Sequence, residues 1–297
     1  MTFVERRLTT SIALGEGSYG ESGFDTVTLD GYRMTAAIEK NGIPAMNMAV
    51  LRVYGMDPSL MNRLSRVGVV PTAVRNNVVT VMAGDLGGTQ SLAFAGVLMD
   101  AWADYGGAPE VSFNITASTG YLQNMKPVLP SSYPGPTDVV TIMQNLANVM
   151  GYTLENNFDG PSGIVLSSPY LPGTARAQAI AAAAAADIFL VLEDDDGIMA
   201  IFPKSGARAT AIPLIQPPPY GEMVGYPSYI GPGLIQVKML YNPGVRFMGN
   251  VRIQNSIVTP ANGLWRVTKL THSLSSQMPD GDWFTSIVAN NQLASVA

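Results

Sequence analysis

The clearest structural signal in the chain is the sequence LIQVKML at residues 234–240, followed by RFMGNVRI at residues 246–253. In the first segment Ile235, Val237 and Met239 alternate with other residues, and the second segment alternates in the same way. Successive side chains of a β-strand point to opposite faces of a sheet, so this alternation predicts half-buried strands. We therefore predict an antiparallel β unit in the C-terminal part of the chain.

Two further predicted strands, 264–270 and 283–289, complete this unit. The turn sequences that separate the strands are Asn242-Pro243-Gly244, Asn262-Gly263 and Pro279-Asp280-Gly281. Trp265 and Trp283 each follow one of these turns closely. If their strands pair antiparallel, we expect the two rings near the same end of the sheet, in aromatic cross-strand contact.

Residues 1–112 also contain short apolar segments separated by turns. Asp57-Pro58 is expected to open a short helix that extends to Leu64, and the turn at 84–88 is expected to join two strands into a hairpin. The predicted strands cover residues 24–29, 47–54, 77–83 and 91–98. Short strands at this spacing are typical of an antiparallel barrel or sandwich.

Helical signals appear in the middle of the chain. Apolar residues recur at helical spacing over 139–150, with Thr137 as the predicted N-cap and Gly151 at the position where a glycine stops a helix. A second helix is predicted over 174–186, beginning at Thr174 and running through six consecutive alanines.

A predicted β-hairpin (188–193 and 198–203) and a proline-rich stretch (211–229) follow these helices. The proline-rich stretch is interpreted as an extended linker or an ordered wrapping loop. The predicted fold class is mainly β, with two antiparallel β-barrel-like domains flanking an α+β domain. The predicted domains are an N-terminal β-barrel-like domain over 1–112, an α+β middle domain with the linker over 113–228, and a C-terminal β-barrel-like domain over 229–297.

The composition argues against several classes of function. The chain of 297 residues has a formal net charge of −5, which provides no basic surface for direct recognition of nucleic acid. Only 13% of its residues are charged, against about 25% in ordinary soluble domains. Such a surface suits a subunit that buries much of its area against partners. The most apolar stretch, 177–192, is shorter than the ~20 residues that a bilayer requires, so no membrane span is predicted.

Cysteine is absent, and His272 is the only histidine. The absence of cysteine excludes disulfides, thiolate zinc sites and a cysteine nucleophile, and it fits assembly in a reducing cytoplasm. A transition-metal site would need nearly all-carboxylate ligands, which is uncommon. We therefore predict no cofactor and no metal.

Two motifs have both a functional and a structural interpretation. Gly15-x-Gly17-x-x-Gly20 matches a dinucleotide fingerprint, but a strand-like segment follows where the fingerprint needs a helix, so a loop is predicted. The acidic run 193–196 lacks the alternating ligands of a calcium loop and is expected to be a solvated hairpin tip.

The catalytic candidates are equally weak. His272 has no positioned serine in a Gly-x-Ser-x-Gly elbow, so it is interpreted as a structural or rim histidine. Paired carboxylates could in principle serve glycoside hydrolysis, but nothing in the sequence pairs the available acids. We predict no catalytic, cofactor-binding or metal-binding residues, and no enzyme. The acids considered are Asp100, Asp104, Glu110, Glu155 and Asp159.

The C-terminal stretch carries a resemblance to a known family. The segment 240–249 leads into Val251-Arg252-Ile253, then Asn262-Gly263-Leu264-Trp265-Arg266-Val267 leads to His272, and Gly281-Asp282-Trp283 follows. This order of loop, strand, Asn-Gly, Trp-x-Val, His and Gly-x-Trp resembles the closing barrel of phage baseplate hub proteins of the Mu-like and late-control-protein-D type. The order of the three predicted domains also fits that family.

The resemblance implies a structural hub subunit of a contractile phage tail. In such a hub a homotrimer contributes six similar barrels, so that a quasi-sixfold ring connects the tail tube to the central spike. The implied partners are the tail tube or tube-initiator protein and the central spike, with tape measure and baseplate wedge proteins as further candidates. The implied location is the baseplate of the virion, after assembly in the host cytoplasm.

Two alternatives remain open at this point. One is another tail ring protein, such as a distal tail or tube-initiator subunit. The other is a virion polysaccharide-binding or depolymerising protein, which would need exposed aromatic clusters. Aromatic residues make up only 8% of the chain, and Trp102 is expected to lie in a core.

Overall fold

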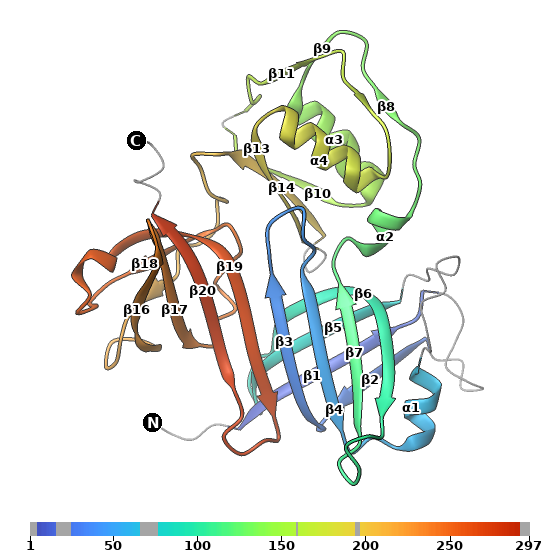
Figure 1. Cartoon of the computed structure of the whole chain (residues 1–297), viewed down its shortest axis with the longest axis vertical. Coiled ribbons are helices and arrows are strands. Elements are labelled where there is room, and N and C mark those ends of the chain that lie inside the picture. The colour runs from blue at the N-terminus through green and yellow to red at the C-terminus, as the bar shows by residue number, and fades with distance from the viewer. Residues whose placement is uncertain (1–4, 16–24, 66–76, 159, 194–196, 292–297) are drawn as a thin grey trace.

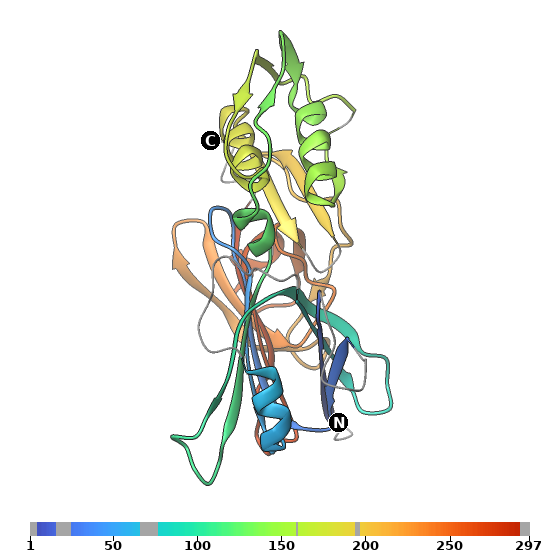
Figure 2. The ribbon, with the colours of Figure 1, turned by 90° about the vertical axis from the view of Figure 1, so that its right-hand side faces the viewer.

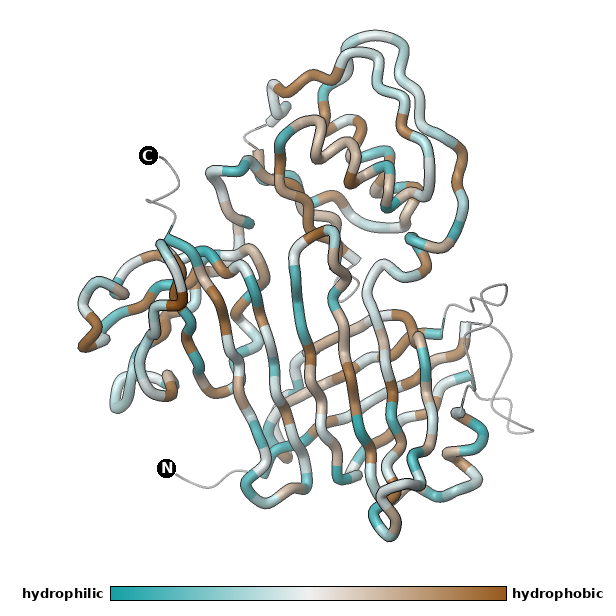
Figure 3. The backbone as a smooth tube through the Cα atoms, viewed as in Figure 1, coloured by the Kyte–Doolittle hydropathy of each residue, from teal (hydrophilic) through white to brown (hydrophobic). Residues whose placement is uncertain are grey.

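Strand formation follows the alternation of apolar residues in the sequence. The structure is a computed structural model that describes residues 5–15, 25–65, 77–158, 160–193 and 197–291. In β17 (Leu234–Leu240), Ile235, Val237 and Met239 are buried, and the residues between them are more exposed. Figure 3 shows the same alternation of hydrophobic and hydrophilic positions along many strands. Because strands with this alternation have one apolar face, they bury these faces together in a mainly β protein with few helices.

Thirteen strands of the described part form one large sheet, in which all neighbours are antiparallel except the parallel pair β15–β18. The order is β16-β17-β20-β19-β3-β4-β7-β6-β5-β1-β2, with β18 between β15 and β19. The strands before the middle block are β1 (Arg6–Ala13), β2 (Thr26–Asp30), β3 (Arg33–Lys40), β4 (Met48–Tyr54), β5 (Val78–Asp85), β6 (Ser91–Asp104) and β7 (Ser112–Ser118). Those after it are β15 (Leu214–Ile215), β16 (Met223–Gly231), β17, β18 (Asn250–Ile253), β19 (Gly263–Ser276) and β20 (Trp283–Asn291), with a short 3-10 turn at Thr259–Ala261.

The first and last parts of the chain are joined through β3 and β19. These two strands pair antiparallel, from Leu270 opposite Lys40 to Ser276 opposite Met34. The described sheet therefore runs without interruption from the strands of the N-terminal part, the opening unit, to those of the C-terminal part, the closing unit. The division into domains at residues 112 and 228, and the arrangement as two separate barrels, remain predictions.

The opening unit folds its sheet over its own core. Figures 1 and 2 show β1, β2 and β5 on one side and β3, β4 and β7 on the other, with α1 (Pro58–Leu64) at one end. The core between them includes Phe94 and Phe113, and also Leu274 and Trp283 from the closing unit. The closing unit has a second core of its own, which includes Trp265.

The middle block packs two helices on a small sheet. β13 (Ile188–Glu193) and β14 (Ile198–Pro203) form the predicted hairpin, and β10 (Thr153–Asn156) adds in parallel to β14. A third core lies between this sheet and the helices (Figure 1). The remaining elements of the block are α2 (Tyr121–Met125), β8 (Ser131–Ser132), β9 (Pro136–Asp138), α3 (Val139–Met150), β11 (Val165–Ser167), β12 (Tyr170–Leu171) and α4 (Ala175–Ala185).

The helix ends are close to the predictions, with one correction. Gly151 ends α3 in the left-handed conformation with φ 77°, and Thr174 caps α4 by accepting a hydrogen bond from the Ala177 amide at 3.2 Å. The N-cap of α3 is Asp138, not Thr137, because the Asp138 carboxylate accepts a hydrogen bond from the Val140 amide at 2.8 Å.

Two strand-level predictions were wrong in the C-terminal part. The strand expected over 246–253 begins only at residue 250, because Phe247 turns into a small core shared with the middle block. The rings of Trp265 and Trp283 lie at opposite ends of the β19–β20 pair, opposite Asn291 and Leu274 respectively. Trp283 is the first residue of β20 and Trp265 the third of β19, and the starts of two paired antiparallel strands lie at opposite ends of the pair.

The proline-rich stretch is more structured than predicted. Its later part belongs to β16, which pairs with β17, and its early part contributes β15. Pro227 fits in β16 because this strand lies at the end of the sheet, where a missing amide donor is tolerated. Trp102, expected in a core, is 40% exposed on β6.

Candidate functional site

The loop between β3 and β4 (residues 41–47) projects from the large sheet onto the middle block (Figure 1). Asn47 is buried, and its side-chain Oδ1 accepts a hydrogen bond from the Asn41 amide at 3.0 Å. This hydrogen bond links the two ends of the loop within the loop itself.

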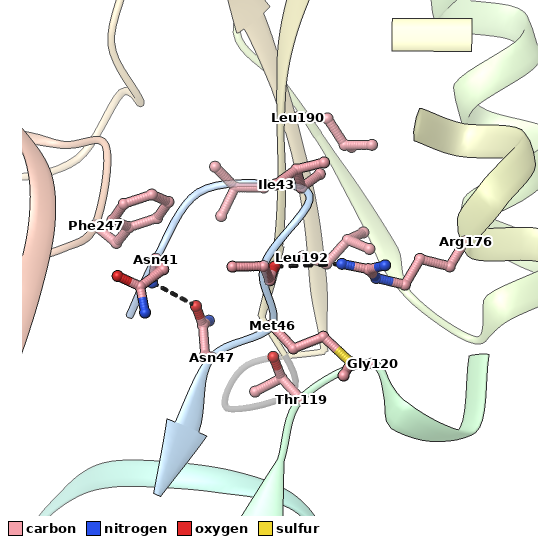
Figure 4. Close-up of a pocket in the computed structure, with 12 residues that line it drawn as sticks. Asn41, Ile43, Met46, Asn47, Thr119, Gly120, Arg176, Leu190, Leu192 and Phe247 are labelled. Atoms are coloured by element: carbon pink, nitrogen blue, oxygen red, sulfur yellow. Dashed lines mark hydrogen bonds between the residues drawn. The ribbon is translucent and has the colours of Figure 1, made fainter. Parts of the chain in front are cut away.

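Arg176, at the start of α4, anchors this loop to the middle block. Its Nη2 donates to the carbonyl oxygens of Pro44 and Ala45 at 2.6 and 3.2 Å, and Figure 4 shows the guanidinium pointing at the loop. The space left among the surrounding side chains is about 10 Å³, close to the smallest volume that holds one water molecule. The loop and the block are therefore in packed contact, with no room for a ligand.

A group of charged side chains, three of them buried and one half-buried, lies near this contact, and we call it the junction network: Lys40, Glu193 and Arg208, with the half-buried Glu155. Arg208 Nη1 lies 2.6 Å from Glu193 Oε2, and its Nη2 lies 2.8 Å from Glu155 Oε2. Lys40 Nζ lies 3.7 Å from Glu193 Oε1. The side chains of Lys40, Glu193 and Arg208 are at most 5% exposed.

The junction network connects all three parts of the chain. Lys40 ends β3 in the opening unit, Glu193 ends β13, and Glu155 lies in β10 of the middle block. The Arg208 amide donates to the Met248 carbonyl at 3.0 Å, just before β18 of the closing unit. A buried ion pair of this kind fixes geometry, because moving one part would leave charges buried without partners.

The charges of the network hold one another ionised. Burial alone would raise the pKa of Glu193, but Lys40 and Arg208 outweigh it and hold that pKa below its ordinary value. Burial likewise opposes the ionisation of Glu155, and Arg208 lowers its pKa. Burial would also lower the pKa of Arg208, but the two carboxylates raise it instead. Glu155, Glu193 and Arg208 are therefore charged at neutral pH.

His272 lies beside this network in the interior of the sheet. Its Nδ1 is 2.9 Å from the Thr285 hydroxyl, which also accepts a hydrogen bond from the Asn242 amide. Its ring meets the ring of Tyr241 edge-on at 5.2 Å. Burial, together with the nearby Lys40 charge, lowers the pKa of His272 to about 3. The imidazole is therefore neutral at physiological pH and enclosed by neighbouring side chains.

The carboxylates considered from the sequence do not come together as a catalytic pair. Asp100 and Asp104 lie on β6, Glu110 pairs with Arg33, and Glu155 belongs to the junction network. Among the described residues, no group of three His, Asp or Glu side chains could hold a metal ion. Asp159, like Gly17 and Gly20 of the glycine motif, lies outside the described residues.

The acidic run at the tip of the β13–β14 hairpin needs a correction. Glu193 was expected to be solvated, but its side chain is buried against Lys40 and Arg208. Residues 194–196 lie outside the described residues. No local pattern marks Lys40 and Arg208, because their partners lie far away in the sequence.

An exposed apolar surface lies on β16, the strand at one end of the sheet order. We call Val224, Tyr226, Tyr229 and Ile230 the β16 edge patch; these side chains are between 41% and 54% exposed. In the described part β16 pairs only with β17, so its other edge is unpaired. Exposed apolar side chains on an unpaired strand edge indicate an interaction surface.

Comparison with known families identifies the class of protein. A family model described as Baseplate hub gp41 matches residues 14–287 of this chain. The chain belongs to this baseplate hub family. It is therefore a structural protein of the phage tail baseplate, and a component of the virion. No curated protein matches the sequence.

Solved structures of tail proteins share the fold of this hub-family chain. The 43 kDa tail protein of prophage MuSo2 from Shewanella oneidensis has a TM-score of 0.61 at 11% identity, with 98% of each chain covered. The tail protein from Neisseria meningitidis MC58 has a TM-score of 0.61 at 10% identity, with 96% of each chain covered. The E. coli c3393 protein, a component of the type VI secretion system similar to T4 tail proteins gp27 and gp5, has a TM-score of 0.56 at 9% identity. That match covers 87% of this chain and 73% of the c3393 chain.

The TM-scores show a common fold, and the functional assignment comes from the family match alone. In the described part of this hub protein, no helix has the length and apolar character needed to cross a membrane.

Proposed function

We propose that this baseplate hub protein is a homotrimeric ring subunit that connects the tail tube to the central spike of a contractile tail. Its proposed partners are the tube or tube-initiator protein and the spike, with tape measure and wedge proteins at the periphery. The proposed route is assembly in the host cytoplasm followed by incorporation into the baseplate. In this role the chain binds and positions other proteins and catalyses no reaction.

The observation that carries this proposal is the pairing of β3 with β19. This pairing fixes an opening and a closing β unit, each with its own core, side by side on one sheet. Three copies then present six β units, which is the arrangement needed where a threefold spike meets a sixfold tube. The junction network supports the same role, because it holds the middle block in one orientation on both units.

Two surface properties support association with other subunits. Only 13% of the residues are charged, and the β16 edge patch is apolar and exposed. A closed cyclic trimer would bury such surfaces between neighbouring copies. We expect each interface to exceed about 1,600 Å² in total, the size typical of specific stable complexes.

The test is the copy number of the chain in purified tails, measured by mass or by imaging of the baseplate. We expect three copies per tail. Six copies would favour a distal tail or tube-initiator ring, and one copy would exclude a ring. Monomers of the isolated protein at low concentration would not contradict the proposal, because ring closure can require the tube or spike as a template.

A further inference from the structure

A groove of about 600 Å³ lies between the middle block and the closing unit, within the range of roughly 300–1,000 Å³ found for ligand pockets. We call it the junction groove. Its apolar wall includes Ile180 and Ala184 of α4, Phe189 of β13 and Met248. The junction groove is thus far larger than the water-sized gap around Arg176, and the described part of the chain leaves it open.

Two cationic side chains lie close to the same aromatic ring in this groove. Lys204 Nζ lies 4.3 Å from the centre of the Phe189 ring, and Arg266 Cζ lies 4.9 Å from the same point. Arg266 is only 4% exposed. Its Nη1 donates to the carbonyl oxygens of Lys204 and Gly206 at 3.0 and 2.6 Å, and its Nε donates to Asn290 Oδ1 at 3.3 Å.

The charge of Arg266 has no acidic partner in the described part of the chain, where no carboxylate lies within 4 Å of its guanidinium nitrogens. The contrast is Arg208, which is equally buried and contacts two carboxylates. Among the described carboxylates, Lys204 has one long contact, of 3.9 Å to Asp187, whose side chain is 88% exposed. Buried arginines are normally paired with acids, so a positive charge at the groove remains uncompensated.

We propose that the junction groove docks a short apolar segment of another tail protein, with an Asp or Glu of that segment paired to Arg266 and Lys204. Apolar side chains of the segment would cover Ile180, Phe189 and Met248, which gives the hydrophobic contribution. A carboxylate would supply the missing partner, since guanidinium–carboxylate pairs form strong charge-assisted hydrogen bonds. One copy of this chain supplies the whole groove, so the proposal does not depend on the number of copies in the ring.

The test uses assembled tails and site-specific photocrosslinking. Ala184→p-benzoylphenylalanine places the crosslinker in the groove, and Ala181→p-benzoylphenylalanine, on the exposed face of the same helix but outside the groove, is the matched control. After irradiation, mass spectrometry identifies the crosslinked segment. We expect the Ala184 variant, and not the Ala181 variant, to crosslink to one apolar segment of another tail protein that contains an Asp or Glu next to the crosslinked residue.

A charge reversal in the same background tests the ionic part. Lys204→Glu should lower the crosslink yield roughly tenfold or more, as expected when a close charge pair becomes a repulsive one. Lys126→Glu, an exposed lysine away from the groove, should leave the yield unchanged. The hub content of the tails and the thermal unfolding of each variant are measured in parallel, so a folding defect is recognised. The proposal is overturned if tails with normal hub content give no Ala184 crosslink, or if the crosslink joins two hub copies. It is also overturned if the crosslinked segment lacks a carboxylate, or if Lys204→Glu leaves the crosslink yield unchanged.

Discussion

At the scale of single residues, Arg208 neutralises two carboxylates in the interior of the junction network. We expect Arg208→Met to lower the free energy of unfolding by about 3–5 kcal/mol, because the buried Glu193 carboxylate would lose the guanidinium that lies 2.6 Å from it. Chemical denaturation at neutral pH measures this change. Arg33→Met is the control: it removes an ion pair with Glu110 that is largely exposed, so its effect should be much smaller. Equal losses of unfolding free energy for the two variants would contradict a larger contribution of the junction network than of an exposed ion pair.

The contribution of this network to the stability of the protein should decrease as the pH falls. The pKa values of Glu155 and Glu193 are lowered in the folded protein, so their contribution is present above the ordinary glutamate pKa of about 4.3. It is lost as the pH falls through the lowered values. The stability difference between the native protein and Arg208→Met should therefore shrink on acidification.

His272 gives a second, separable pH effect. Burial and the Lys40 charge lower its pKa to about 3, whereas the unfolded chain takes up this proton near pH 6.5. The folded state therefore loses stability as the pH falls from about 6.5 towards 3, by about 2 kcal/mol at pH 5 relative to pH 7.

We expect His272→Gln to remove this part of the pH dependence. The measurement is the difference in unfolding free energy between native and variant protein at pH 7 and pH 5. Tail assembly and infectivity should stay normal, or fall together with stability. Normally assembled tails that fail at a later chemical step would contradict the structural role of this histidine.

At the scale of elements, β19 and β20 each serve two cores. Trp283, the first residue of β20, packs in the core of the opening unit against Tyr241, at a ring distance of 5.6 Å. Trp265, near the start of β19, packs in the core of the closing unit and donates its indole N–H to the Ala261 carbonyl at 2.8 Å. The two tryptophans therefore stabilise different parts of the molecule.

Truncation of either tryptophan ring should lower the stability of the protein, and each truncation should loosen a different part of it. Trp265→Ala and Trp283→Ala should each lower stability by roughly 3–5 kcal/mol. Hydrogen exchange read by mass spectrometry should show faster exchange in β1 and β3 for Trp283→Ala, and in β17 and β18 for Trp265→Ala. If Trp283→Ala loosened only the closing unit, the proposed sharing of cores would be wrong.

At the scale of the whole molecule, the β16 edge patch is the surface most suited to contact between copies. We expect Tyr229→Glu to leave folding unchanged, because this side chain is exposed in the single chain. Association should weaken by about 2 kcal/mol or more if the ring is buried at the centre of an interface. Hub content of purified tails and sedimentation of the concentrated protein measure this loss.

Tyr170→Glu is the matched control for this change. Tyr170 is also an exposed tyrosine, at 64% exposure, but it lies on β12 of the middle block. Its replacement should leave hub content unchanged. Equal behaviour of the two variants would show that the β16 edge patch is not an interface between copies.

The sequence by itself determined the local elements of this protein. Alternation predicted β17 and β4, the Asp57-Pro58 pair predicted α1, and Thr174 and Gly151 marked helix ends that the structure confirms. It also supported the hub family, which the family match then showed. These features depend on consecutive residues, whose side-chain periodicity and capping preferences act over a few positions.

Only the tertiary structure decided which distant segments meet. It joined the opening and closing units through β3 and β19, placed Trp283 in the opposite core from Trp265, and turned Phe247 away from the strand predicted for it. It also brought the junction network together. Lys40, Glu155, Glu193 and Arg208 each look like ordinary surface charges in the sequence, because their charges matter only once folding removes water between them. Register and the burial of these charges arise from pairing across the whole chain, and no local pattern encodes them.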